Sequence, residues 1–522
     1  MKKSLIFAGL ALSILSCGST QQQITQKESI TSIDPTVYGK SITEGELKDL
    51  LYIYASDEFE GRDTGSKGQK MAVEFLKKHY VDLDIPSPLP GGNYYQNVPL
   101  ISQKAPEVDV TVNGVAFETY TDVVPLGSAT TQTITASDII YAGYGIDSEN
   151  YSSYDGLDVK GKIVLIKAGE PKNNDGTYVT SGTTENTKWS SGRQALASKR
   201  EAAMNKGVKT LLYMDDAYTK SMGNFMQAAA KSGGGGRLSL EGKQDNMVQI
   251  LIGDNLGKAL LADIETDDTS KNIKTNLNIK ITSNSENISS ENVLAFIKGS
   301  EKPDEVIVLS AHLDHEGIKN GEIYNGADDD GSGTVALLEI AEAFKLAEKA
   351  GHGPKRSILF LHVTGEEKGL LGSSYYADIE PIFPLENTVA NLNIDMIGRI
   401  DPKRTGDRNY VYLIGSDKLS TDLHNISEEV NNKYANVTLD YTYNDENDPN
   451  RFYYRSDHYN FAKNNVPVIF YFNGTHDDYH RPSDTPDKIN YDLLENRTRL
   501  VFYTAWELAN RDARIVVDKI SK

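Results

Sequence analysis

The stretch VIVLSAHLD, residues 306–314, decides the fold of the C-terminal part of this chain. It begins as an apolar run of strand length and passes directly into His312 and Asp314. Further strand candidates lie at 292–298, 357–363, 389–394, 410–414 and 466–472. Helix candidates lie at 334–348, 369–377, 418–433 and 491–510. Because strands alternate with helices, we predict an α/β fold with a doubly wound, mostly parallel (mixed) sheet.

Residues able to bind a metal ion come directly after several of these strands. They are His312 after the first strand, Glu366 and Glu367 after 357–363, Asp395 after 389–394 and His480 after 466–472. Asp329 lies in a glycine-rich acidic loop, NGADDDGSG, residues 325–333. In doubly wound sheets, binding sites form beyond the C-terminal ends of the strands. We therefore expect these side chains to meet at one edge of the sheet.

The residue types suit zinc, which binds histidine nitrogen and carboxylate oxygen. Two metal ions about 3.5–4 Å apart need a bridging carboxylate, terminal ligands on each ion and an open position for water. Two histidines and three carboxylates satisfy this need, and a further carboxylate can take the proton from the water as general base. The acidic loop alone could bind calcium, but it lacks the acidic residue at position twelve of an EF-hand. The set therefore predicts a site for two zinc ions.

As a set, these motifs resemble the co-catalytic zinc peptidase family. That family includes leucyl aminopeptidases, glutamate carboxypeptidase-type enzymes and glutaminyl cyclases. The resemblance covers about residues 290–490 and the segment EFEGRDTGS, residues 58–66. It implies a ligand set in which His312 and Asp395 hold one zinc ion, Glu367 and His480 hold the other, and Asp329 bridges the two.

The same resemblance implies roles for residues around the metal ions. Glu366 would be the general base, and Asp314 would hydrogen-bond the far nitrogen of the first metal-binding histidine. The Asp329–Asp330 peptide is expected to be cis. Asp457 lies in a segment that resembles the family near the substrate pocket, and it would either orient the amino group of the substrate or have a structural role. Tyr479 directly precedes His480 in the sequence and would help to form the substrate pocket.

The activity that the resemblance implies is that of a zinc-dependent exopeptidase, foremost an aminopeptidase that removes N-terminal residues from peptides by means of a metal-bound hydroxide. A carboxypeptidase or dipeptidase on the same scaffold is the first alternative. It would need a basic cluster for the substrate carboxylate, which the sequence does not locate. A glutaminyl cyclase, which works with one zinc ion, is the second. A relative without catalysis is the third, and the complete set of ligands and base disfavours it.

The remaining histidines lack these neighbours and have simpler expected roles. His362 lies within a strand candidate, so we expect it in the core. We expect His315 and His476, which lie in loops, to be exposed.

The middle of the chain, residues 126–284, consists of short β-rich runs. The segments 142–145, 154–165 and 206–213 resemble the protease-associated domain. In that family the domain is not catalytic and lies beside the mouth of the active site. We therefore expect a peptidase domain made of 41–125 and 285–522, interrupted by a protease-associated insert at 126–284. Thr43 and Glu46 form a capping box that predicts a helix just after Thr43.

The N-terminus predicts export. After the basic start MKK, residues 4–16 are apolar or small, and this run is too short to span a bilayer. Residues 14–17, ILSC, resemble the lipobox of bacterial lipoproteins, which implies cleavage before Cys17 and lipidation of its thiol. Residues 1–17 would then be the signal peptide and 18–40 a flexible tether. We expect a lipid-anchored protein that faces the periplasm, with the cell surface as the alternative.

The net charge of the chain limits the partners that it can bind. The formal net charge is −20, and no basic cluster follows the first residues. Nucleic acid binding requires a concentrated basic face, so the charge argues against nucleic acid as a partner. Peptides are the substrates that the family resemblance implies. Cys17 is the only cysteine, so the chain has no intramolecular disulfide. The sequence carries no signal for the oligomeric state or for side-chain preference.

Overall fold

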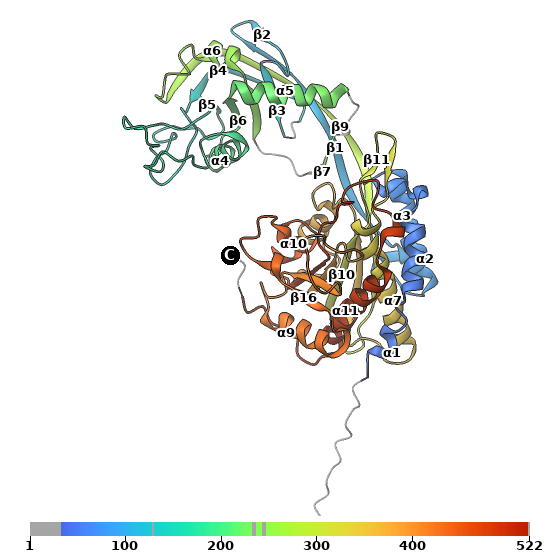
Figure 1. Ribbon diagram of the computed structural model, residues 1–522. Helices are drawn as coiled ribbons and strands as arrows, with labels where there is room; N and C mark the ends of the chain where they lie inside the picture. The colour runs from blue at the N-terminus through green and yellow to red at the C-terminus, as the bar shows by residue number, and fades with distance from the viewer. Residues whose placement is uncertain (1–32, 128–129, 232–235, 243–246, 520–522) are drawn as a thin grey trace, which may run out of the picture.

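The computed structural model describes residues 33–127, 130–231, 236–242 and 247–519. Figure 1 shows two lobes, with both described ends of the chain in the lower one. The predicted signal peptide and the lipidation site at Cys17 lie outside the described residues. Within the described ranges, no helix is both long enough and apolar enough to cross a membrane.

The lower lobe is built on a mixed sheet with strand order β16-β15-β17-β14-β10-β13-β9. These strands are β9 Lys271–Ile297, β10 Lys302–His312, β13 Arg356–Val363, β14 Thr388–Ile394, β15 Tyr410–Ile414, β16 Thr438–Asp440 and β17 Val468–Phe472. β10 pairs in parallel with β13 and β14, and β14 pairs in parallel with β17. β9 and β15 add the antiparallel pairs. The predicted doubly wound, mostly parallel sheet is confirmed.

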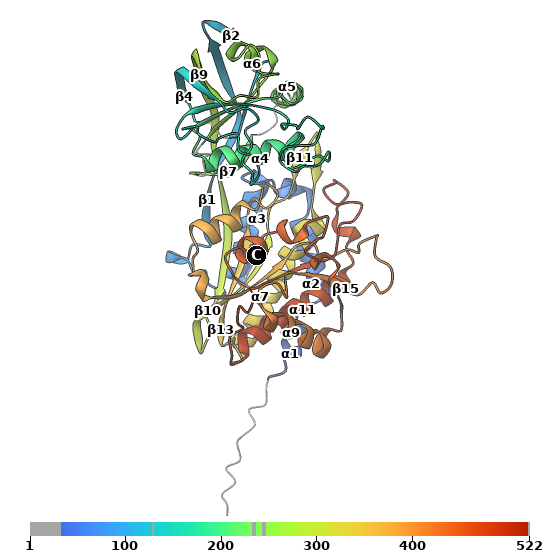
Figure 2. The same cartoon turned by 90° about the vertical axis from the view of Figure 1, so that its left-hand side faces the viewer.

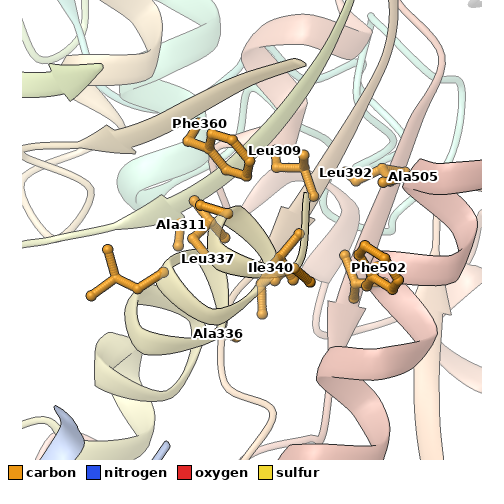
Figure 3. Packing of buried hydrophobic residues seen from close by; sticks show 14 of the residues in the cluster. Leu309, Ala311, Ala336, Leu337, Ile340, Phe360, Leu392, Phe502 and Ala505 are labelled. Carbon is orange, nitrogen blue, oxygen red and sulfur yellow. The ribbon is translucent and has the colours of Figure 1, made fainter. Parts of the chain in front are cut away.

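Both faces of this sheet are buried, which explains why its strands are apolar throughout. Alternate residues of a strand point to opposite faces. On β10, Leu309 and Ala311 face the core shared with helices α7 Gly333–Lys349 and α11 Tyr491–Asn510 (Figure 3), whereas Val308 belongs to the cluster on the other face.

The described chain begins in ordered structure. Thr36–Gly39 forms the short helix α1, in which the ring of Tyr38 stacks on Trp506 of α11 at a centroid distance of 5.7 Å. The predicted tether at 18–40 is therefore wrong for its last residues, because Tyr38 buries its ring in the core. The predicted helix start is confirmed, since the Thr43 hydroxyl accepts from the Glu46 N–H at the start of α2 Glu44–Tyr54. The second half of the capping box differs, because the Glu46 carboxylate accepts from the Thr43 hydroxyl.

The upper lobe continues the same sheet through β9. Its strands are β3 Val123–Leu126, β4 Gln132–Tyr141, β5 Ile163–Lys167, β6 Thr210–Met214 and β8 Val248–Ile252. Helices α4 Gly192–Asn205, α5 Asp216–Lys231 and α6 Asp254–Leu260 accompany them. Two further apolar clusters form the core of this lobe.

Two long strands connect the lobes. β1 Tyr95–Val112 runs antiparallel to β9, and Figure 2 shows both passing from the lower lobe into the upper one. Val108, Val110 and Val112 of β1 precede residue 126 and yet pack in the core of the upper lobe. The insert expected at 126–284 thus shares strands with the rest of the chain. Its assignment to the protease-associated family and its boundaries stay a prediction.

Two of the leucines of α7 provide a test of the core. Leu337 is fully buried, whereas Leu346 on the same helix is 41% exposed. We expect Leu337→Ala to destabilise the protein by about 2–5 kcal/mol, because it leaves a cavity in a closely packed core. The matched control Leu346→Ala should change the midpoint of thermal unfolding much less. Equal shifts in the two variants would contradict this account of the core.

Candidate metal centre

The predicted ligands follow neighbouring parallel strands. His312 ends β10, Glu367 follows β13, Asp395 follows β14 and His480 lies in the loop after β17. Asp329 lies in the turn before α7. Parallel strands end at the same edge of a sheet, so these loops converge there. The structure brings all five side chains together, as predicted from the strand ends and the acidic loop.

The first group of ligand atoms surrounds the imidazole of His312. Its Nε2 lies 3.1 Å from Asp329 Oδ1 and 3.7 Å from Asp395 Oδ1. All three residues are buried. These three atoms can hold one cation.

The second group surrounds the imidazole of His480. Its Nε2 lies 3.0 Å from Asp329 Oδ2 and 3.2 Å from Glu367 Oε1. Asp329 therefore directs one carboxylate oxygen to each group. This is the arrangement of a carboxylate that bridges two cations.

The donor atoms fit zinc. His312 Nε2, Asp329 Oδ2 and Glu367 Oε1 are buried and, among the described residues, have no hydrogen-bond partner. Leaving such atoms unpaired costs about 1–3 kcal/mol each, and a bound cation would satisfy them together. Ligands about 2.0–2.2 Å from a tetrahedral zinc ion lie roughly 3.3–3.6 Å from one another, close to the separations in both groups.

The electrostatics favour a cation in the same place. Burial opposes protonation of His480, but Asp329 and Glu367 outweigh it and raise its pKa to about 10. Burial likewise opposes ionisation of Glu367, yet His315 and His480 lower its pKa below the ordinary value. The convergent carboxylates therefore stabilise positive charge at their common point.

Asp330 fixes the loop that carries Asp329. Its carboxylate accepts hydrogen bonds from the N–H groups of His312 (3.2 Å), Gly333 (2.9 Å) and Met396 (3.1 Å). A Cβ atom at Gly333 would lie 2.4 Å from Asp330 Oδ1, so only glycine fits there. The Asp329–Asp330 peptide is cis, as expected.

A second buried carboxylate supports this loop from the other side. Asp484 Oδ2 accepts from the N–H groups of Asp328 and Asp329 at 3.0 and 3.2 Å. Asp328 Oδ2 in turn lies 3.2 Å from His476 Nε2. His476 is buried, so the prediction that it is exposed is wrong: it lies within hydrogen-bonding distance of a buried carboxylate. Its sequence neighbours gave no signal for this contact.

Asp314 supports the site differently from the prediction. Its main-chain carbonyl, not its carboxylate, lies 2.9 Å from the Nδ1 of His312, whereas the nearer carboxylate oxygen is 4.0 Å away. The carboxylate accepts from the Thr64 hydroxyl (2.6 Å) and from the Glu366 N–H (3.1 Å). The predicted side-chain hydrogen bond to His312 is therefore wrong, because the chain turns and presents its own carbonyl.

Ser456, which contacts Asp395, directly precedes Asp457 in the chain. The Ser456 hydroxyl donates to Asp395 Oδ2 at 2.6 Å and thereby orients the ligand. Asp457 is fully buried, accepts a hydrogen bond from Ser373 and does not line the pocket beside the ligands. Burial raises the pKa of its carboxyl to about 7.

Glu366 stands apart from the ligand atoms and faces a small pocket. It is half-buried, and burial, with Glu367 and Asp395 nearby, raises its pKa well above the ordinary value. The pocket has a volume of about 30 Å³. Its other lining residues are Asp329, Asp395, Met396, Phe452, Arg455, Phe470, Phe472, Thr475 and Tyr479. Tyr479 stacks on the ring of His480 at 3.9 Å, as expected for a pocket residue.

The other two histidines give one correction and one confirmation. His315 is fully buried against the second group, so the prediction that it is exposed is wrong: the turn after β10 directs it inward. His362 is buried in β13 within 2.8 Å of the Tyr80 hydroxyl, as expected.

The fold and the shared aspartate define an α/β protein with a histidine–carboxylate metal centre. Residues 292–505 match Peptidase family M28. The resemblance to zinc peptidases is thereby confirmed for the α/β domain.

Individual relatives agree. A probable zinc metalloprotease of Pyrenophora tritici-repentis is 40% identical over 124 residues, 22% of this chain and 23% of that protein. A probable leucine aminopeptidase of Trichophyton verrucosum is 32% identical over 227 residues, 42% of this chain and 57% of that protein. The chain thus spans less than two thirds of either relative. The solved aminopeptidase from Aneurinibacillus sp. strain AM-1 shares the fold, with a TM-score of 0.50 at 18% identity over 94% of this chain and 99% of that one.

Asp330 offers a test of how the centre is held. Asp330→Asn keeps the shape but turns an NH₂ group toward at least one of three N–H donors. We expect a loss of about 1–3 kcal/mol in stability and reduced zinc content, because the loops that carry the ligands separate. The control is Asp477→Asn, an exposed change of equal charge in the loop of His480. Wild-type zinc content and thermal stability in Asp330→Asn would contradict the role of this carboxylate.

Proposed function

We propose that the chain is a zinc-dependent aminopeptidase that holds two zinc ions and hydrolyses the N-terminal residue from peptides. The observation that carries this proposal is Asp329, which directs one oxygen to each ligand group. An unligated carboxylate, Glu366, opens on a pocket beside both groups. The match to Peptidase family M28 and the aminopeptidases among its relatives support the proposal.

The ligand side chains would divide the two ions between them. His312 and Asp395 would hold one ion and Glu367 and His480 the other, with Asp329 shared. When bound, two zinc ions acidify a water molecule and polarise the scissile carbonyl. Ser456 keeps the Asp395 carboxylate turned toward its ion.

Glu366 would move the proton. Its raised pKa suits a group that takes a proton from water and then delivers it to the leaving amine. The Asp314 carboxylate holds the Glu366 main chain and so fixes where this side chain starts. Base and ligand are consecutive residues, which keeps their separation constant.

The pocket would receive the N-terminal residue of the peptide. Its wall is aromatic and apolar, with Phe452 and Phe472 packed at a centroid distance of 4.9 Å, and little space remains between them. The free amino group would lie at the acidic edge of the pocket. Asp457 is fully buried and does not line the pocket, so we do not assign the amine to it. Small apolar N-terminal residues should therefore fit best.

The alternatives meet less support. A carboxypeptidase needs a basic cluster, but among the residues that the structure describes Arg455 is the one cationic residue that lines the pocket. Arg399 nearby faces Asp478 at 2.9 Å and Asp484 at 3.8 Å. A single-zinc glutaminyl cyclase would not need the ligand group around His312, which is complete here.

Anchoring is proposed on the sequence alone. The apolar N-terminal run followed by ILSC supports cleavage before Cys17, lipidation of its thiol and a position on the periplasmic face of a membrane. This segment lies outside the described residues.

Glu366→Gln tests the proposed base. We expect the rate to fall by about 10²–10⁴-fold, because an amide cannot accept the proton, while zinc content stays that of the wild type. The control is Glu386→Gln, an exposed glutamate that precedes β14, at the opposite end of this strand from Asp395. Retained turnover in Glu366→Gln would refute the assignment.

A substrate panel tests the class of reaction. Peptides and 4-nitroanilides with a free N-terminal alanine should be hydrolysed, whereas N-acetylated forms of the same compounds should not, because they lack the amine that the carboxylates bind. Phenylalanyl substrates should be slower, since the pocket is narrow. A chelator should abolish turnover and zinc should restore it.

Other outcomes of the panel identify the alternatives. Release of C-terminal residues from N-acetylated peptides would favour a carboxypeptidase. Cyclisation of N-terminal glutamine with one bound zinc ion would favour a cyclase. Turnover that a chelator does not affect would overturn the proposal.

A further inference from the structure

We infer that His315 is a further ligand of the zinc ion held by Glu367 and His480, so that this half of the centre has four protein ligands. The inference rests on the proposed function, since it assumes the two ions. It adds a residue to the five ligands predicted from the sequence. It also makes the two halves of the centre unequal.

The position of His315 is built into the fold. The residue follows Asp314 in the turn after β10, and its N–H donates to the Arg62 carbonyl at 3.3 Å. The guanidinium of Arg62 returns to this region and donates to the carbonyls of Leu313 and Gly326 at 3.2 and 3.0 Å. Hydrogen bonds to both the main chain and the side chain of Arg62 therefore fix the main chain around His315.

The ring of His315 occupies space that Gly326 leaves free. A Cβ atom at Gly326 would lie 2.5 Å from the Cγ of His315, and Gly326 has a φ of +53°. Any larger residue there would displace the imidazole from the ligand atoms. The glycine thus serves the placement of this ring as well as the turn.

The ring nitrogen Nδ1 points into the second ligand group. It lies 3.0 Å from Glu367 Oε1 and 3.9 Å from Asp329 Oδ2. The corresponding distances from His480 Nε2 are 3.2 and 3.0 Å. The two imidazoles therefore approach the same pair of carboxylate oxygens, at separations near those expected between the ligands of one zinc ion.

Protein hydrogen bonds do not account for His315. The side chain is fully buried, and neither ring nitrogen has a hydrogen-bond partner within the described ranges. Glu367 Oε1, only 3.0 Å from Nδ1, is equally unpaired. One shared cation would satisfy both of these facing atoms.

Four protein ligands give this ion the closed coordination of a tightly held metal, whereas catalytic zinc sites keep a position open. The open position then falls to the ion held by His312, Asp395 and Asp329. This ion would lie beside Glu366, so the open coordination position and the proposed base would lie on the same side of the metal centre. The two zinc ions should therefore be removed by chelators of different strength.

The test is the zinc content of purified wild-type protein and His315→Ala after dialysis against chelators of graded strength. Wild type should retain two ions and lose them in two steps. His315→Ala should lose the tighter ion at least about ten-fold more easily, and free imidazole should restore the retention. The matched control His352→Ala removes an exposed histidine bound to Tyr38, far from the centre, and should behave as wild type.

Cobalt substitution separates a ligand from a neighbour that only positions Glu367. Loss of an imidazole ligand should change the visible absorption of the cobalt protein, and imidazole should reverse the change. An unchanged spectrum, or unchanged retention of the tighter ion, would overturn the inference while the proposed function stands. Wild-type protein that binds no zinc would overturn both. Equal thermal stability of the metal-free variant and wild type confirms that the variant folds.

Discussion

The metal centre depends on one buried carboxylate that binds no metal in our account. Asp330 accepts the N–H groups of His312, Gly333 and Met396, and so connects the end of β10, the start of α7 and the end of β14. Each of these segments carries or adjoins a proposed ligand. Main-chain donors have no rotamers to lose, and their bonds to a carboxylate are charge-assisted, so they place the ligands more precisely than the loops alone would. The glycine at 333 follows from the same contact.

A cost accompanies this design, because several carboxylates are buried within one small volume. Asp328 and Asp484 rely on main-chain donors, on His476 and on Arg399. Asp329 and Glu367 have histidines as neighbours and retain unpaired oxygens. Buried charge without a partner is expensive, so the structure is consistent only if cations complete the site. The fold and the proposed zinc chemistry therefore have the same physical origin.

Much of this could be predicted from the sequence, because strands and the residues that end them leave a local signal. The run at 306–314 indicated both a buried strand and the ligand that follows it. His315 and His476 were missed because their burial depends on how loops fold back on one another. Asp314 was assigned the wrong contact, since the sequence does not show which of its oxygens a turn presents. The burial of Tyr38 and the long strands shared by both lobes were not predicted for a related reason, because their partners lie far away in the sequence.

The most direct test of the central claim is anomalous diffraction at the zinc edge from crystals of the full chain grown with zinc. Our account predicts two peaks about 3.5–4 Å apart, one on each side of the Asp329 carboxylate, with Glu366 bound to neither. A single peak, or peaks that do not share Asp329, would contradict it.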